Sequence, residues 1–336
     1  MQRRFSDYLL ISLKGLAMGA ADAVPGVSGG TIAFISGIYE ELINTISGIN
    51  LDLFKKLRSE GFSSFWQVLN GNFLMALLIG IIVSFVSFMR LAKYLIEYHP
   101  VLIWSFFFGL IIASIYFVGK QITKWNLATV TTLIIGSIIA YYITLLPSSA
   151  NNESSLFLFI AGAIAICAMI LPGISGSFIL VILGAYKTLS DALHDFDFKR
   201  IFIFASGALV GLLSFSHILK WLFKHYHNIT LALLTGFIFG SLNKIWPWKM
   251  TETVMEKASG KILPFSEVSD LNNLTLYQQQ VVDFESYKVV AEKSVSALTY
   301  SELNNNIDSQ WPLAVVLMIV GFSTIFILER LGKKPK

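Results

Sequence analysis

Apolar residues occur along this chain in long stretches that polar segments separate. Six of the stretches are 18–24 residues long, at 72–95, 101–119, 127–146, 201–223, 229–246 and 311–329. A helix needs about 20 apolar residues to cross the hydrocarbon core of a bilayer. The pattern therefore predicts an all-α polytopic membrane protein in which each of these stretches is a transmembrane helix.

Two further apolar stretches, 9–44 and 156–189, are too long for a single crossing. Each is interrupted near its middle, by Val24-Pro25-Gly26-Val27-Ser28-Gly29-Gly30 and by Leu171-Pro172-Gly173-Ile174-Ser175-Gly176-Ser177. Proline removes a backbone donor and disfavours helix at the residue before it. Unwound backbone at membrane depth persists only inside protein or beside a water-filled cavity. Both stretches therefore predict re-entrant hairpins, although ten full spans stay open as the alternative.

The two breaks are copies of one another. A shift of 147 residues places Pro25, Gly26, Ser28, Gly29, Gly37, Tyr39 and Leu42 on Pro172, Gly173, Ser175, Gly176, Gly184, Tyr186 and Leu189. A shift of 127 residues aligns a second block, from Gly80 on Gly207 to Ser114 on Ser241. Such self-similarity indicates an internal duplication. We expect a first membrane repeat at 1–146 and a second at 147–336, each with one hairpin and three spans.

The distribution of Lys and Arg predicts the orientation, because short cytoplasmic loops are enriched in both. Basic clusters at 3–4, 55–58, 120–124, 220–224 and 330–336 are expected in the cytoplasm, and 147–155, 191–197 and 249–310 outside. Three spans per repeat is an odd number, so the second repeat is inverted and both termini are cytoplasmic. Arg90, Lys93, Lys199 and Arg200 fall on the outer side against this rule.

Composition supports this class of protein and excludes others. Hydrophobic residues make up 55% of the chain and charged residues 14%, against about 25% charged in soluble domains. Residues 249–310 hold five Lys and nine Asp or Glu, which predicts a polar extracytoplasmic insert. The net charge of +4 has no basic face or recognition motif with it, so no nucleic-acid partner is expected. A single Cys and five scattered His predict no metal site, and we expect no cofactor.

Inverted repeats with a broken helix in each half are typical of secondary transporters. Half-helices that begin after each break point free N–H groups and their positive dipole ends at a bound anion. The predicted substrate site consists of Asp22, Pro25, Gly26, Ser28, Gly29, Gly30, Thr31, Pro172, Gly173, Ser175, Gly176 and Ser177. In the alternative interpretation the breaks only kink the helices, and the small residues permit close packing.

Charged residues near the breaks add candidate roles. Asp22 lies in an apolar hairpin, where an ionisable group is costly and indicates function. It either takes up a coupling proton, with sodium coupling also open, or accepts backbone N–H bonds that hold the break. Lys14 is expected to pair with Asp22 or to help hold an anion. The repeat mates Lys93 and Lys220 are candidate guides for a phosphate at each entrance, or they extend to the membrane interface.

The first break resembles a family signature. Residues 15–33 read GLAMGAADAVPGVSGGTIA and are followed by Gly37-Ile38-Tyr39-Glu40. This segment, and 171–177 with it, is similar to bacterial polyprenyl-phosphate transporters. The resemblance implies that the chain moves undecaprenyl phosphate from the outer to the cytoplasmic leaflet of the bacterial cytoplasmic (inner) membrane, for recycling in cell-envelope synthesis. It also implies that both breaks receive the phosphate headgroup.

Two other functions compete with this one. A small-anion channel or exchanger uses the same kind of helix break. A polyprenyl-diphosphate phosphatase has a Pro-Gly-x-Ser-Arg-Ser motif, but the position of its Arg is Gly29 in one copy here and Gly176 in the other. Hydrolysis needs a charge clamp on the transferred group and a general base. We therefore expect a transporter and not an enzyme. The sequence leaves its oligomeric state and its coupling ion open.

Overall fold

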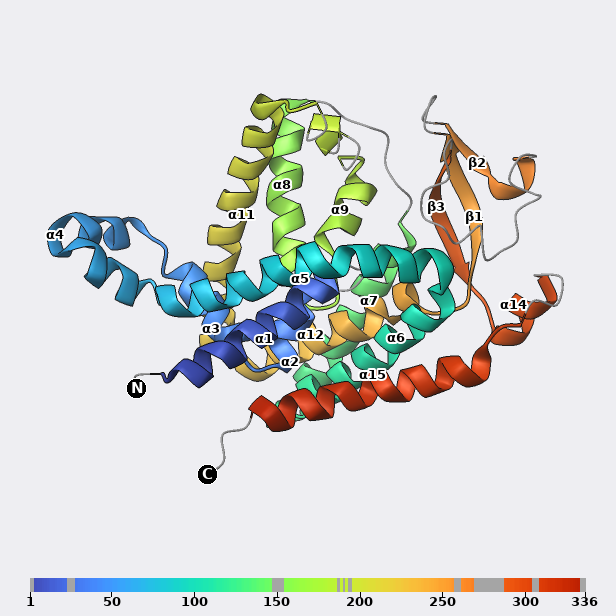
Figure 1. Ribbon diagram of the computed structural model, residues 1–336, viewed down its shortest axis with the longest axis horizontal. Coiled ribbons are helices and arrows are strands. Elements are labelled where there is room, and N and C mark those ends of the chain that lie inside the picture. The colour runs from blue at the N-terminus through green and yellow to red at the C-terminus, as the bar shows by residue number, and fades with distance from the viewer. Residues whose placement is uncertain are drawn as a thin grey trace.

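The computed structural model describes residues 3–22, 28–146, 154–185, 188–189, 191–192, 195–256, 261–268, 287–303 and 308–332. Most of them are helical, and a small sheet stands at one end of the molecule (Figure 1). The first half contains α1 (Phe5–Asp22), α2 (Gly29–Ile35), α3 (Tyr39–Ser47), α4 (Leu51–Val68), α5 (Gly71–Tyr98), α6 (Pro100–Gly119) and α7 (Leu127–Leu145). The second contains α8 (Ser155–Ile170), α9 (Gly176–Leu183), α11 (Phe198–His225), α12 (His227–Gly240), the 3-10 helix η1 (Ser241–Ile245) and α15 (Trp311–Gly332).

Local sequence accounts for several helix starts. Asn126 caps α7 by accepting the N–H of Thr129 at 2.9 Å, and the Thr129 hydroxyl accepts the N–H of Asn126 at 2.9 Å. Ser154 caps α8 by accepting the N–H of Phe157. Pro100 occupies the first turn of α6, where the N–H that it lacks has no helical partner. Polar residues between the apolar stretches therefore set where the long helices begin.

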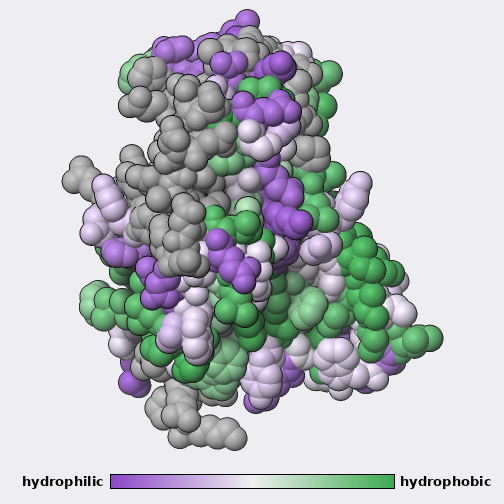
Figure 2. Space-filling view, turned by 90° about the vertical axis from the view of Figure 1, so that its right-hand side faces the viewer, coloured by the Kyte–Doolittle hydropathy of each residue, from purple (hydrophilic) through white to green (hydrophobic). Residues whose placement is uncertain are grey.

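Within the described residues, four helices are long and apolar enough to cross a membrane: α6, α7, α11, and α12 with η1 (His227–Ile245). A fifth candidate is the bent pair of α4 and the first part of α5, whose axes differ by 54°. Large apolar side chains stay exposed along α7, among them Ile134, Ile138 and Tyr142. Hydrophobic surface covers much of the lower and right-hand part of the face in Figure 2. The fold is that of a polytopic, mainly helical membrane protein.

The helices associate in pairs: α1 with α5, α8 with α11, α6 with α15, and α7 with α12. In the first pair a Cβ at Gly15 would overlap the carbonyl oxygen of Leu77, and in the second a Cβ at Gly162 would overlap that of Phe204. Gly162 lies 147 residues after Gly15, and Phe204 lies 127 residues after Leu77. These are the shifts that align the two breaks and the second block, so equivalent positions make equivalent close contacts.

The segment between η1 and α15 contains strands, which the expectation of an all-α chain missed. β1 (Lys249–Glu256), β2 (Ile262–Pro264) and β3 (Tyr287–Ser294) form an antiparallel sheet in the order β2-β1-β3. The 3-10 helix η2 (Phe265–Glu267) follows β2, and α14 (Ala297–Leu303) follows β3. Trp248 and Tyr300 pack with Val101 of α6 and Ala314 of α15, which anchors this segment to the helices. In Figure 1, α1 begins and α15 ends on the side away from the sheet.

The sequence between α3 and α5 also differs from expectation, because a loop is expected there and α4 is a helix. It bends at Gly61, whose φ is 83°, and it projects from the rest of the molecule (Figure 1). Asp52, Lys55, Lys56, Arg58 and Glu60 all lie before this bend, and residues 61–68 carry no charge. The first half of α4 therefore has the polar pattern of a surface helix, and the second half belongs with α5 in the bent candidate span.

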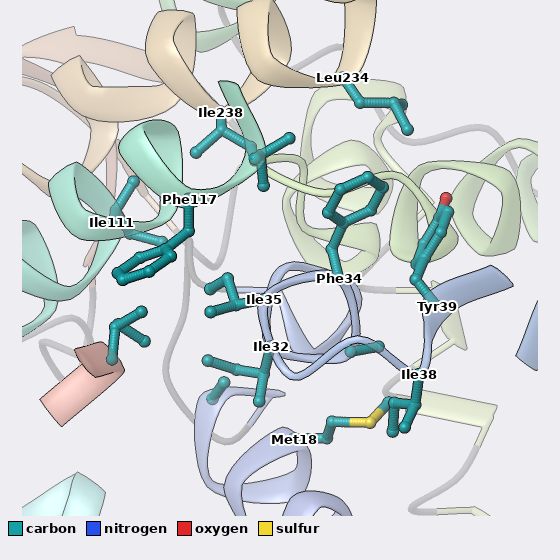
Figure 3. Close-up of a cluster of buried hydrophobic side chains, with 14 of the residues drawn as sticks. Met18, Ile32, Phe34, Ile35, Ile38, Tyr39, Ile111, Phe117, Leu234 and Ile238 are labelled. Carbon is teal, nitrogen blue, oxygen red and sulfur yellow. The ribbon is translucent and has the colours of Figure 1, made fainter. Parts of the chain in front are cut away.

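The short helix α2 lies at the centre of the core. Apart from Gly30, all of its residues are buried. Ile32 and Ile35 point toward the side of the cluster where Ile111 and Phe117 of α6 lie, and Phe34 lies nearer Leu234 of α12 (Figure 3). Because helices from both halves surround α2, the first break is held inside the protein.

Candidate functional site: the paired helix breaks

The first break is closed by groups from its own hairpin. The Gly29 N–H at the start of α2 donates to the Asp22 carboxylate at 2.6 Å, and the Gly30 N–H donates to the Ser28 hydroxyl at 3.1 Å. A Cβ at Gly29 would overlap the Asp22 carboxylate, so glycine is required for this approach. Asp22 thus makes the backbone hydrogen bond that its second expected role requires. Its coupling role stays a prediction.

The two breaks contact each other directly. The Ser28 hydroxyl donates to the carbonyl oxygens of Met169 at 3.2 Å and Leu171 at 3.4 Å. The Gly173 N–H donates in the opposite direction, to the Thr31 hydroxyl at 2.9 Å. Ser28 and Thr31 are buried. Described segments of the two breaks, more than 140 residues apart in sequence, are therefore joined by hydrogen bonds between hydroxyl and backbone groups.

The second break turns at Gly173, whose φ is 88° and where a Cβ would overlap the backbone of Ile238 in α12. Gly173 and Ser175 line a cavity of about 10 Å³ together with Ala140, Ile143, Thr144, Ile174 and Lys244. That volume is close to the minimum for one water molecule and is too small for a phosphate. The structure thus holds the breaks in a closed arrangement.

Lys244, in η1, is a residue that sequence reasoning missed. Its ammonium group is 3.3 Å from the Glu292 carboxylate of β3, and it lines the cavity beside the second break. The one sequence feature that could have drawn attention to Lys244 is its position near the end of an apolar stretch, beside the Trp246-Pro247-Trp248 cluster. An interfacial lysine of this kind has no sequence feature that reveals a partner 48 residues away.

The structure corrects the expected pairing of Lys14 with Asp22. The Lys14 ammonium donates to the Ser36 carbonyl at 2.7 Å, at the C-terminal end of α2, while Asp22 binds the N-terminal end. A cation there complements the helix dipole. Lys14 and Asp22 thus stabilise opposite ends of the same short helix.

Lys220 lines a separate cavity of about 220 Å³ between α3 and α11, together with Glu40, Ile43, Asn44, Phe223 and Lys224. Glu41, next to Glu40, accepts two hydrogen bonds from Arg3 at 2.7 and 2.6 Å and one from Asn70 at 2.8 Å. Pro25 and Gly26 lie outside the described residues. The remaining predicted residues are placed as follows. Pro172 is buried at the second break, Gly176 and Ser177 form the start of α9, and Lys93 lies in α5.

Comparison with known proteins identifies the family of this chain. The sequence profile of the undecaprenyl phosphate translocase-like family matches residues 18–263. The chain belongs to this family. A protein of Vibrio cholerae serotype O1 named polyprenyl-phosphate transporter is 42% identical over 334 residues, which cover 99% of this chain and 100% of the relative.

A second relative, from Staphylococcus aureus and also named polyprenyl-phosphate transporter, is 36% identical over 262 residues. The match covers 72% of this chain and 88% of the relative. No solved structure gives a significant match. The family confirms the resemblance read from the first break, and the transporter names of both relatives agree with the expectation that the chain is not an enzyme.

Proposed function

We propose that this chain transports polyprenyl phosphate, with undecaprenyl phosphate as its carrier lipid, from the outer to the cytoplasmic leaflet of the bacterial cytoplasmic membrane. The observation that carries the proposal is the 42% identity to a polyprenyl-phosphate transporter over nearly the whole chain. The contact between the two breaks, at the centre of the helices, supports a site there for the phosphate headgroup.

The proposed architecture is an inverted repeat with re-entrant hairpins. The pairing of α1 with α5 matches the pairing of α8 with α11, and the pairing of α6 with α15 matches that of α12 with α7. Gly37 and Gly184, which the shift of 147 residues aligns, have φ values of 72° and 73°. These equivalences support a pseudo-twofold relation between the halves, with both termini cytoplasmic and the sheet outside.

Transport requires the closed breaks to exchange partners. A phosphate that enters would accept hydrogen bonds from the N–H groups of Gly29 and Gly30 and from the Ser28 hydroxyl. In the closed arrangement the Gly29 N–H binds Asp22, the Gly30 N–H binds Ser28, and the Ser28 hydroxyl binds the second break. The Asp22 carboxylate competes with the phosphate, because both are anions that favour a helix N-terminus. Protonation of Asp22 would remove this competition, which gives a physical route to proton coupling. Sodium coupling is the alternative.

Hydrolysis is disfavoured by the same geometry. The position that corresponds to the phosphatase arginine is Gly29, where even a Cβ would overlap the Asp22 carboxylate. The break therefore has no room for a long cationic side chain that would clamp a transferred phosphoryl group.

The decisive experiment uses proteoliposomes with a fluorescent polyprenyl phosphate and a membrane-impermeant quencher. We expect protein-dependent exchange of the probe between leaflets without release of inorganic phosphate. Folded protein that exchanges no more probe than empty vesicles would overturn the lipid assignment, and small-anion flux in the same vesicles would replace it. Release of phosphate would overturn the assignment as a transporter.

Two glycine variants link that exchange to the breaks. Gly29→Ala places a methyl group where the Asp22 carboxylate now approaches the start of α2. Because a phosphate would have to approach the same N–H groups, we expect at least tenfold slower exchange. Gly119→Ala is the matched control, because the nearest atom to its added Cβ is 3.9 Å away, on Thr235. Equal exchange by both variants would argue against headgroup passage through the breaks.

A further inference from the structure

An apolar groove lies beside the second break. It is a cavity of about 480 Å³ between α7, α12 and η1, with Phe108 of α6 and Trp246 also in its wall. This volume falls within the usual range of ligand sites, about 300–1,000 Å³. Ile138, Tyr141, Phe239 and Leu242 supply much of the remaining lining, and Asn243 and Ser294 are polar groups on it.

The polar part of the groove adjoins a cluster of charges. The Ser294 hydroxyl donates to the Asn243 side-chain oxygen at 2.9 Å. Lys244 directly follows Asn243, and Glu292 is two residues before Ser294 in β3. The Glu292 carboxylate lies 3.3 Å from the Lys244 ammonium and 3.6 Å from that of Lys249. Lys244 therefore lies between the groove and the second break, because its neighbour Asn243 is in the wall of the groove and Lys244 itself lines the small cavity with Gly173 and Ser175.

The cluster lets Lys244 change partner without leaving the carboxylate uncompensated. Lys249 is buried beside Glu292, donates to the Lys244 carbonyl, and packs over the Trp104 ring at 4.8 Å. Lys249 therefore keeps Glu292 paired when Lys244 turns toward another anion. A charge-assisted bond from an ammonium to a phosphate oxygen is among the stronger hydrogen bonds in proteins.

We propose that this groove is the outer-side binding site of the lipid, in which the polyprenyl chain lies along α7 and α12 and its phosphate binds Lys244 and the Asn243 amide. The inference rests on the proposed function and adds a site to it. An apolar groove that ends beside a partly exposed lysine fits a lipid with a long hydrocarbon chain and one small anionic head. From Lys244 the phosphate reaches Gly173 and Ser175 of the second break.

The test measures equilibrium binding of a fluorescent polyprenyl phosphate to the full chain in nanodiscs. We expect Lys244→Gln to weaken binding at least tenfold, and Lys244→Arg to retain most of it because the charge stays. Lys199→Gln removes an exposed charge in the first turn of α11 and should leave binding unchanged. Glu292→Gln removes the competing carboxylate, so we expect tighter binding, whereas simple damage to the sheet would weaken it.

Competition identifies the ligand. Unlabelled polyprenyl phosphate should displace the probe, and polyprenol, phosphatidylglycerol and inorganic phosphate should not do so at the same concentration. Equal displacement by phosphatidylglycerol would overturn the inference in favour of a general lipid groove, and equal displacement by inorganic phosphate would overturn the role of the chain. Wild-type binding by Lys244→Gln, in protein that still exchanges lipid between leaflets, would overturn this site and leave the proposed function standing.

Discussion

In the described part of the first break, the side chains of Asp22, Ser28 and Thr31 have hydrogen-bond partners inside the protein. Asp22 binds Gly29, Ser28 binds Met169 and Leu171, and Thr31 binds Gly173. Buried polar groups left without partners would each cost about 1–3 kcal/mol. In the function that we propose, binding of a headgroup would be an exchange of hydrogen-bond partners, and the residues that hold the closed arrangement would be the ones that receive the phosphate.

Asp22→Asn separates the hydrogen bond of this residue from its charge. The amide oxygen still accepts the Gly29 N–H, but the side chain no longer takes up a proton at neutral pH. We expect pH-driven uptake of polyprenyl phosphate into proteoliposomes to be lost, while exchange without a pH gradient persists. Loss of both activities in folded protein would show that Asp22 is structural, and retention of both would remove it from the coupling.

At the scale of elements, the lengths of the apolar stretches predict the long helices well, because a span must match the membrane. The expected 101–119 and 127–146 compare with Pro100–Gly119 and Leu127–Leu145. The sheet was not predictable in this way, since β1 pairs with β3 across about 30 intervening residues and no run of apolar residues marks either strand. For the candidate site, the sequence predicted the backbone hydrogen bond of Asp22 as one of two possible roles. It did not predict the contacts of Lys14 and Lys244, because these depend on tertiary packing.

Close helix pairing makes a prediction about two aligned glycines. Gly15→Ala and Gly162→Ala should each destabilise the protein by about 1–3 kcal/mol, because the new methyl group meets a carbonyl oxygen of the neighbouring helix. Unfolding in mixed micelles with increasing denaturing detergent measures this free energy. Gly119→Ala is the control with room for the methyl group. A large effect at only one of the two glycines would contradict equivalent packing in the two halves.

The sheet should lose stability in acid. Burial alone would raise the pKa of Glu292, but the Lys249 and Lys244 ammonium groups override it and lower that pKa from 4.5 to about 2. A carboxyl whose pKa is lower in the folded state stabilises that state above its unfolded pKa. This contribution is complete above about pH 4.5 and disappears as the pH falls toward 2.

Hydrogen exchange of the β1 and β3 amides measures this effect. Their protection should fall between about pH 4.5 and 2 in the wild type, after correction for the intrinsic exchange rate. In Glu292→Gln the same amides should show lower protection that no longer changes over this interval. Wild-type amides with constant protection would show that the ion cluster does not stabilise the sheet.

At the scale of the whole molecule, the described residues line cavities in two regions. The apolar groove and the small cavity at the second break lie near Lys244 and the sheet, and the third cavity adjoins Lys220 and Lys224 near the C-terminal end of α11. In the closed arrangement the small cavity at the second break holds no more than about one water molecule. If the headgroup passes through the breaks, as we propose, they have to separate, and we expect the helix pairs that carry them to move as units.

A reversible cross-link tests that requirement. In a Cys167→Ala background, Ser28→Cys with Met169→Cys introduces one thiol into each break, at two residues joined by a hydrogen bond of 3.2 Å from the Ser28 hydroxyl to the Met169 backbone carbonyl. Formation of the disulfide is verified by gel mobility before exchange is measured. We expect oxidation to stop leaflet exchange and reduction to restore it. Ser12→Cys with Ala76→Cys is the control, because the Ser12 hydroxyl lies 2.8 Å from the Ala76 carbonyl within the α1–α5 pair. That cross-link joins residues of one unit and should leave exchange unchanged.

Two outcomes would contradict this expectation. Exchange that continues with the breaks covalently joined would mean that the headgroup crosses elsewhere. Exchange that both cross-links stop would mean that α1 and α5 also move against each other.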